Sequence, residues 1–143
     1  RDSLYRTPAD LDRIVIHGGL VRLCKGAYAE PAEVAYQDRD SVDAAFDALT
    51  RRLMAIPGVT PAIATHDDDR IALTKRLAED RARPWEFQML YGVRRNLQRS
   101  LLNEGHPVRV YVPYGTAWYP YLTRRMAERP ANVAFFLRAA AGR

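Results

Sequence analysis

The sequence has very little cysteine and no long apolar run. Among its 143 residues Cys24 is the single cysteine, which excludes an intramolecular disulfide and a zinc site made of several cysteines. Its longest apolar runs, such as residues 133–137, are far shorter than the about 20 residues that a membrane-spanning helix needs. The N-terminus also lacks the basic and then apolar pattern of a signal peptide. We therefore expect a cytoplasmic protein in a reducing compartment.

A concentrated basic segment is absent as well. The net charge is +5 and the isoelectric point is near 9.7, but basic residues alternate with acidic ones nearly everywhere, as in Asp38-Arg39-Asp40. Nucleic acid is therefore not an expected partner. The remaining composition, 48% hydrophobic and 27% charged, is typical of a globular domain.

Strand-like and helical segments alternate along the chain. The patterns predict strands at residues 21–25, 59–64, 85–90 and 108–112. They predict helices from residue 7 to Gly18-Gly19, from Ser41 to Pro57-Gly58, and at residues 68–79, 92–104, 117–128 and 133–141. Such an order predicts a parallel α/β sheet, and the apolar strand 59–64 is expected to be covered on both faces. Periodicity alone leaves open a doubly wound sheet or part of a (β/α)8 barrel, which is complete at about 250 residues.

Polar and aromatic residues follow each predicted strand, where parallel α/β folds bind their ligands. These stretches are residues 25–28, 65–67, 88–92 and 111–115. Lys25-Gly26 places a cation beside a glycine, which would let a backbone approach a phosphate, although a glycine at this position more often serves the turn. Arg22 lies inside a strand expected to be dry and would need an acceptor.

Two further groups of residues have alternative interpretations. His66 with Asp67, Asp68 and Asp69 would suit a metal-dependent hydrolase, but the same acidic run is typical of a capped helix N-terminus. The second group lies on the predicted helix 117–128 and consists of Tyr121, Arg124, Arg125 and Glu128. Adjacent arginines are usually a solvated face, although a guanidinium held by a carboxylate also suits the grip of a substrate carboxylate.

Five strings resemble the monofunctional bacterial proline dehydrogenases, in that family's order and spacing. They are VRLCKGAY (21–28), ATHD (64–67), EFQMLYG (86–92), RVYVPYG (109–115) and WYPYLTRRMAERPAN (118–132). The similarity runs from about Leu4 to the end of the chain. It implies a distorted (β/α)8 barrel with FAD, of which residues 1–143 would form a partial domain, the C-terminal half with about strands five to eight.

The resemblance also implies an activity. The enzyme would oxidise L-proline to Δ1-pyrroline-5-carboxylate by hydride transfer from C5 to the flavin, the first step of proline catabolism to glutamate. A quinone would accept the electrons, which implies a peripheral contact at the inner face of the membrane. No metal is expected.

Site residues follow from the same resemblance. Arg22 and Tyr111 would be catalytic, since Arg22 would hydrogen-bond the flavin near its reactive nitrogen and Tyr111 would pack over the substrate ring. The residues expected at the cofactor are Arg22, Lys25, Gly26, Ala27, Thr65, His66, Gln88 and Leu90. Those expected at the substrate are Tyr111, Tyr121, Arg124, Arg125 and Glu128, with the two arginines clamping its carboxylate and Glu128 orienting them.

The sequence departs from the family's pattern in several places. Cys24 stands where the family often has Val, and Ala29 where some members have an aromatic residue. A lysine and an aspartate from the family's first strands have no counterpart, and Arg1 lies at or after the place of an expected glutamine. We therefore expect little or no activity from these residues alone. An inactive half barrel or a binding module that dimerises through its unpaired strand edges is the alternative.

Overall fold

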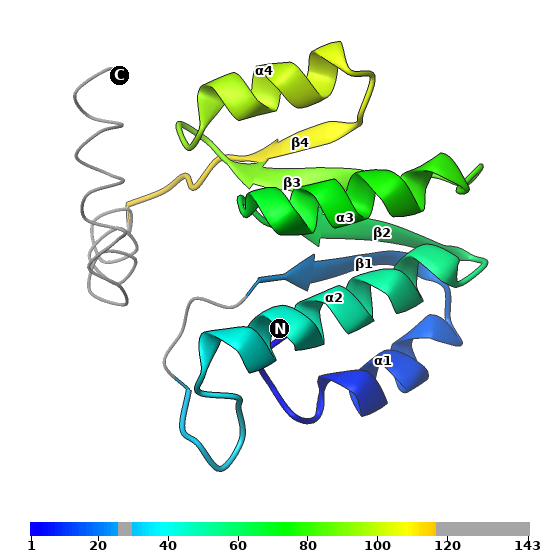
Figure 1. Ribbon diagram of the computed structural model, residues 1–143, viewed down its shortest axis with the longest axis vertical. Helices are drawn as coiled ribbons and strands as arrows, with labels where there is room; N and C mark the ends of the chain where they lie inside the picture. Colours follow the sequence, from blue (N-terminus) through cyan, green and yellow to red (C-terminus); the bar gives the residue numbers. More distant parts are fainter. Residues whose placement is uncertain (26–29, 117–143) are drawn as a thin grey trace.

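The computed structural model describes residues 1–25 and 30–116, in which strands and helices alternate (Figure 1). The strands are β1 (Gly19–Cys24), β2 (Val59–Ala64), β3 (Glu86–Leu90) and β4 (Val108–Tyr111). The helices are α1 (Thr7–Val15), α2 (Arg39–Ala55), α3 (Asp68–Glu79) and α4 (Arg95–Asn103). The elements predicted up to residue 112 are thus confirmed, while those predicted at 117–128 and 133–141 lie outside the described residues.

The sheet has the order β1-β2-β3-β4, and every neighbouring pair is parallel. The predicted mixed α/β fold with a parallel sheet is therefore confirmed. In a doubly wound sheet the strand order reverses at a switch point. The described strands follow chain order without a reversal, so this part of the chain is not doubly wound. In this same part of the chain no helix is long and apolar enough to cross a membrane.

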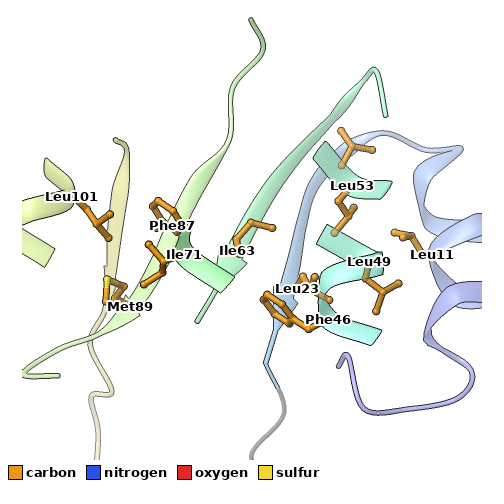
Figure 2. Close-up of a cluster of buried hydrophobic side chains, with 11 residues drawn as sticks. Leu11, Leu23, Phe46, Leu49, Leu53, Ile63, Ile71, Phe87, Met89 and Leu101 are labelled. Carbon is orange, nitrogen blue, oxygen red and sulfur yellow. The ribbon is translucent and has the colours of Figure 1, made fainter. Parts of the chain in front are cut away.

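One apolar core joins the described helices to a single face of the sheet. Leu23, Ile63 and Phe87 are register partners on β1, β2 and β3 and point into this core. Figure 2 shows Ile63 between a group around Phe87 and a group around Phe46. The buried members are Leu11, Leu23, Phe46, Leu49, Leu53, Val59, Ile63, Ile71, Phe87, Met89 and Leu101. Since each described helix contributes to this cluster, these helices all cover the same face.

The opposite face, called here the helix-free face, corrects a prediction. The strand 59–64 was expected to be covered on both faces, yet no described helix packs on this side. Leu20 and Tyr111 point to it and are 54% and 42% exposed, and Arg22 is exposed as well. The physical reason is handedness, because right-handed crossovers that always advance in the same direction place every helix on one side.

Two helices begin elsewhere than the sequence predicts. Helix α2 starts at Arg39, two residues before Ser41, because the Asp38 carboxylate caps it and accepts a hydrogen bond from the Ser41 N–H at 2.7 Å. Helix α4 starts at Arg95 and not at Gly92. Both Gly92 and Arg94 have positive φ, 79° and 49°, which a right-handed helix does not contain.

Candidate active site

The carboxyl ends of the four parallel strands meet at one edge of the sheet (Figure 1). Lys25 follows β1, Thr65 and His66 follow β2, and Leu90 and Tyr111 end β3 and β4. The fold thus brings residues from the four sequence stretches of polar and aromatic character to a common edge. What each side chain does there depends on its contacts.

Arg22 and Tyr111 meet across the helix-free face. Their strands, β1 and β4, lie at opposite edges of the sheet, three interstrand spacings or about 14 Å apart if the sheet were flat. The Arg22 guanidinium nevertheless lies 5.3 Å from the centre of the Tyr111 ring. Arg22 is also level with Glu86 of β3, whereas Tyr111 is level with Leu90, four residues or about 13 Å further along the strands. On a flat face the two Cα atoms would be about 19 Å apart, more than the side chains can span, so this face is concave. The strand of Arg22 was expected to be dry, so that Arg22 would need an acceptor. The expectation of a dry strand is wrong for the described residues, because the guanidinium is exposed and lies against an aromatic ring.

A second polar group occupies the same face. Arg109 of β4 donates two hydrogen bonds to the Glu86 carboxylate, at 2.7 and 2.8 Å, and Gln88 donates a third at 2.7 Å. These bonds, those of Arg109 first, hold the pKa of Glu86 below its usual value. The sequence analysis did not single out Glu86 or Arg109. Polar residues at every second position of β3 and β4 were the signal that would have found them.

His66 is fixed in a neutral form. Its Nε2 accepts a hydrogen bond from the Leu90 N–H at 3.1 Å, which ties the turn after β2 to the end of β3. Burial lowers the pKa of His66 to about 4, and the charge of Arg94 adds to this effect. Because a neutral imidazole carries one hydrogen and Nε2 is the acceptor, the hydrogen is on Nδ1. His66 therefore offers one N–H donor at neutral pH.

Lys25 is held by two carboxylates on the helix-covered side of the turn. Its ammonium nitrogen lies 2.6 Å from a carboxylate oxygen of Asp43 on α2 and 2.6 Å from one of Asp67 after β2. The three side chains are only 13–17% exposed. Burial favours the neutral acid, but the hydrogen bond and charge of Lys25 keep the pKa of Asp67 below its usual value. The ammonium is thus already neutralised without a phosphate.

The acidic run after His66 begins helix α3. The Asp67 carboxylate accepts hydrogen bonds from the N–H groups of Asp69 and Arg70 at 3.1 and 3.3 Å, and the buried Thr65 hydroxyl accepts one from the Asp67 N–H at 3.1 Å. The capping interpretation of this run is therefore confirmed. Within residues 1–25 and 30–116 no group of three or more potential ligands is arranged to hold a metal ion.

A cavity of about 420 Å³ lies at the other end of the sheet. Its lining includes Met54, Leu77 and Arg81. Arg81 donates hydrogen bonds to the carbonyl of Met54, at the end of α2, and to that of Val59, at the start of β2. These contacts lie at the amino ends of the strands, so the cavity is separate from the candidate site at their carboxyl ends. Arg81 stabilises the C-terminal end of α2.

Comparison with known proteins assigns the family. The sequence profile described as proline dehydrogenase matches residues 18–138. The chain belongs to the proline dehydrogenase family. It is 48% identical over 138 residues to proline dehydrogenase 1 of Bacillus subtilis (strain 168), covering 94% of this chain and 45% of that protein. It is 44% identical over 138 residues to the proline dehydrogenase of Deinococcus radiodurans, covering 92% and 43%.

Solved structures give the same assignment. A crystal structure of a bifunctional proline utilization A (PutA) protein matches with a TM-score of 0.81 and 27% identity, over 99% of this chain and 17% of that one. The chain spans less than half the length of the proline dehydrogenases that it matches. The resemblance drawn from the sequence strings is thus confirmed at the level of the family, and the inactive alternative is not favoured.

The structure brings several of the expected site residues together. Arg22 and Tyr111 are brought into contact, His66 and Leu90 are joined by a hydrogen bond, and Gln88 bonds to Glu86. Lys25 and Thr65 lie in the turns after β1 and β2. The expected residues outside the described part of the chain are Gly26, Ala27, Tyr121, Arg124, Arg125 and Glu128. One residue that sequence reasoning missed is Arg94, whose guanidinium contacts the main chain of His66.

Proposed function

We propose that residues 1–143 form the C-terminal half, about strands five to eight, of a (β/α)8 barrel that binds FAD and oxidises L-proline to Δ1-pyrroline-5-carboxylate. The observation that carries the proposal is the contact of Arg22 with Tyr111 over the concave, helix-free face. In a barrel the inward side chains of different strands converge in this way. The strand order without reversal and the family assignment support the same architecture.

The residues near the strand ends fit a flavin in their chemistry. Arg22 has an exposed guanidinium with no ion pair among the described residues, so its charge is free to face an electron-rich ring. His66 contributes one neutral N–H donor, and Thr65 a hydroxyl at the same turn. Lys25 would line the cofactor through its main chain, since its ammonium is paired with two aspartates. Gln88 and Leu90 complete the proposed wall together with Gly26 and Ala27.

When bound, the flavin supplies the acceptor for the hydride that leaves C5 of proline. The chain's own residues orient the substrate and stabilise the charge that develops during the reaction. Arg22 would donate hydrogen bonds to the ring near its reactive nitrogen and would offset negative charge that develops there. Tyr111 packs over the proline ring and rejects a ring hydroxyl by shape. Tyr121 belongs to the same pocket wall, Arg124 and Arg125 clamp the carboxylate, and Glu128 orients the two arginines. A quinone is the proposed final electron acceptor.

The test uses the complete barrel, in which this sequence follows the other four strands. We expect the purified protein to be yellow and to reduce a quinone analogue when L-proline is added. Replacing Arg22 by Met should lower kcat by about a hundredfold, the usual effect of removing one donor to developing negative charge. Arg109→Met is the matched control, since it removes an arginine from the same face that is already paired with Glu86.

Several results would contradict the proposal. Absence of flavin from the purified protein would reject the cofactor, and an equal loss of kcat in the Arg22 and Arg109 variants would reject a specific role for Arg22. Tyr111→Ala should raise KM for proline and improve the relative use of 4-hydroxyproline. An unchanged preference between the two substrates would reject its steric role.

A further inference from the structure

Arg94 has an unusual backbone for its residue type. Its φ of 49° and ψ of 50° lie in the left-handed region, and among the described residues it is the single non-glycine with a positive φ. A side chain at this conformation brings Cβ close to the following carbonyl, which is unfavourable. Such strain persists where the surroundings require it and is concentrated at functional sites. The contacts of Arg94 show what requires it here.

The guanidinium of Arg94 reaches back to the turn after β2. One of its nitrogens donates a hydrogen bond to the His66 carbonyl at 2.7 Å and lies 2.8 Å from an Asp68 carboxylate oxygen. Arg94 itself is the N-cap residue of α4, in the segment that follows the end of β3 at Leu90. It therefore joins the loop that follows β3 to the loop that follows β2, at the strand-end edge.

His66 is consequently held from two directions. The Leu90 N–H fixes its imidazole through Nε2, and Arg94 fixes its main chain. Both holding groups come from the end of β3 and the segment that follows it. A surface ion pair alone would contribute little to stability, so the contact with Asp68 does not account for the strained backbone. The contact that remains is the hydrogen bond from Arg94 to the His66 main chain.

We propose that Arg94 is a positioning residue for the cofactor site: it holds His66 so that the Nδ1 hydrogen of a neutral imidazole is presented to an acceptor oxygen of the flavin cofactor. The inference rests on the proposed function, because it takes His66 to be a cofactor ligand. The nearby positive charge of Arg94, added to burial, also disfavours protonation of the imidazole. Arg94 thus acts on both the place and the charge of His66.

The discriminating variant is Arg94→Gly in the complete flavoprotein. Glycine adopts the left-handed backbone without strain, which offsets its higher entropy in the unfolded chain, so the melting temperature should stay within about 3 °C of the wild type. The dissociation constant for FAD should nevertheless rise about fivefold, the usual effect of losing one neutral hydrogen bond, here the one that His66 Nδ1 would donate to the cofactor. Arg94→Lys should fall between the two proteins. Arg95→Gln is the charge control, because the Arg95 guanidinium lies over the Tyr91 ring and not at His66.

Two results would overturn the proposal. The first is that Arg94→Gly binds FAD as tightly as Arg95→Gln does. The second is that Arg94→Gly loses FAD affinity and also has a much lower melting temperature, which would indicate a general loss of structure. A flavin-free wild type would instead overturn the proposed function. In that case hydrogen exchange of the Leu90 N–H still tests the clamp, since Arg94→Gly should loosen the bond from this N–H to His66 Nε2 and speed its exchange. An unchanged exchange rate would reject the clamp itself.

Discussion

Acid should destabilise this protein through His66 in a defined pH window. The folded protein holds the pKa of His66 at about 4, against 6.5 for the free side chain. Between these two values the unfolded chain binds a proton that the folded protein does not, so the free energy of unfolding falls as the pH drops through this window and the effect is complete below about pH 4. At about 1.4 kcal/mol for each pH unit, the loss is about 3 kcal/mol.

The structure explains where this free energy comes from. A proton on Nε2 would meet the Leu90 N–H, which is now 3.1 Å away as a donor, and the new charge would be buried close to the Arg94 guanidinium. Both changes oppose protonation. A loss of about 3 kcal/mol would be a large share of the stability of an ordinary domain, which is about 5–15 kcal/mol.

The assay is urea unfolding of the wild type and of His66→Gln at a series of pH values from 7 to about 4. Glutamine retains an acceptor for the Leu90 N–H but does not titrate. Acid sensitivity from Asp67 and Glu86, whose pKa values are also lowered, is common to both proteins and cancels in the difference. We expect the stability advantage of the wild type to shrink by about 3 kcal/mol on acidification. A difference that stays constant with pH, or an imidazole that titrates near 6.5 by NMR, would refute the reasoning.

Two further predictions concern stability. Lys25→Met should lower the free energy of unfolding by about 1–2 kcal/mol, because Asp43 and Asp67 lose their shortest contacts to a cation and keep the longer ones to Arg70. The control Arg39→Met removes a cation that is 74% exposed and 3.6 Å from Asp43, and should cost less than about 0.5 kcal/mol; equal losses in urea unfolding would contradict the distinction. Arg81→Ala should cost about 2 kcal/mol in the same assay, since carbonyls at the end of α2 and the start of β2 lose their donor. A loss below about 0.5 kcal/mol would show that water replaces it.

The sequence predicted the succession of elements well because each has a strong local signal. Strand β2 is bounded by Gly58 and by the Thr65-His66-Asp67 turn, and α3 begins at the acidic residues that cap it. The prediction that the acidic residues after His66 cap a helix was confirmed for the same reason, because Asp67 caps α3 through residues next to it in the sequence. Where the cause is local, one sequence is sufficient.

Predictions about faces were less successful because they depend on the path of the chain. An apolar strand such as β2 is compatible with helices on both sides or on one. Ala62 is fully buried although it points to the helix-free face, so a small side chain between two neighbouring strands requires no helix above it. The sequence also did not predict the contact between Arg22 and Tyr111. Tyr111 lies on the opposite edge strand, and its ring reaches Arg22 only because the sheet is curved.

The backbone of Arg94 is the feature that the sequence indicates least. Its segment has helical spacing, and nothing in its residue type indicates a left-handed backbone, which favours glycine and asparagine. Its guanidinium bonds the His66 carbonyl, 28 residues earlier, and a contact across that distance leaves no local pattern in the sequence. A residue that departs from its local preference while making a long-range contact is the pattern expected at a functional site.

The polarity of the helix-free face bears on what could fill the proposed barrel. The interior of such a barrel is usually packed with apolar side chains, but here Arg22, Glu86, Gln88, Arg109 and Tyr111 point to it. Arg109 and Glu86 neutralise each other through two hydrogen bonds, so they can be enclosed together. Arg22 has no such carboxylate within the described residues. The uncharged Tyr111 ring does not neutralise it, and enclosing a charge that is not neutralised would be costly. The proposed barrel therefore favours a further electron-rich group beside Arg22, and a flavin ring against the guanidinium would supply it.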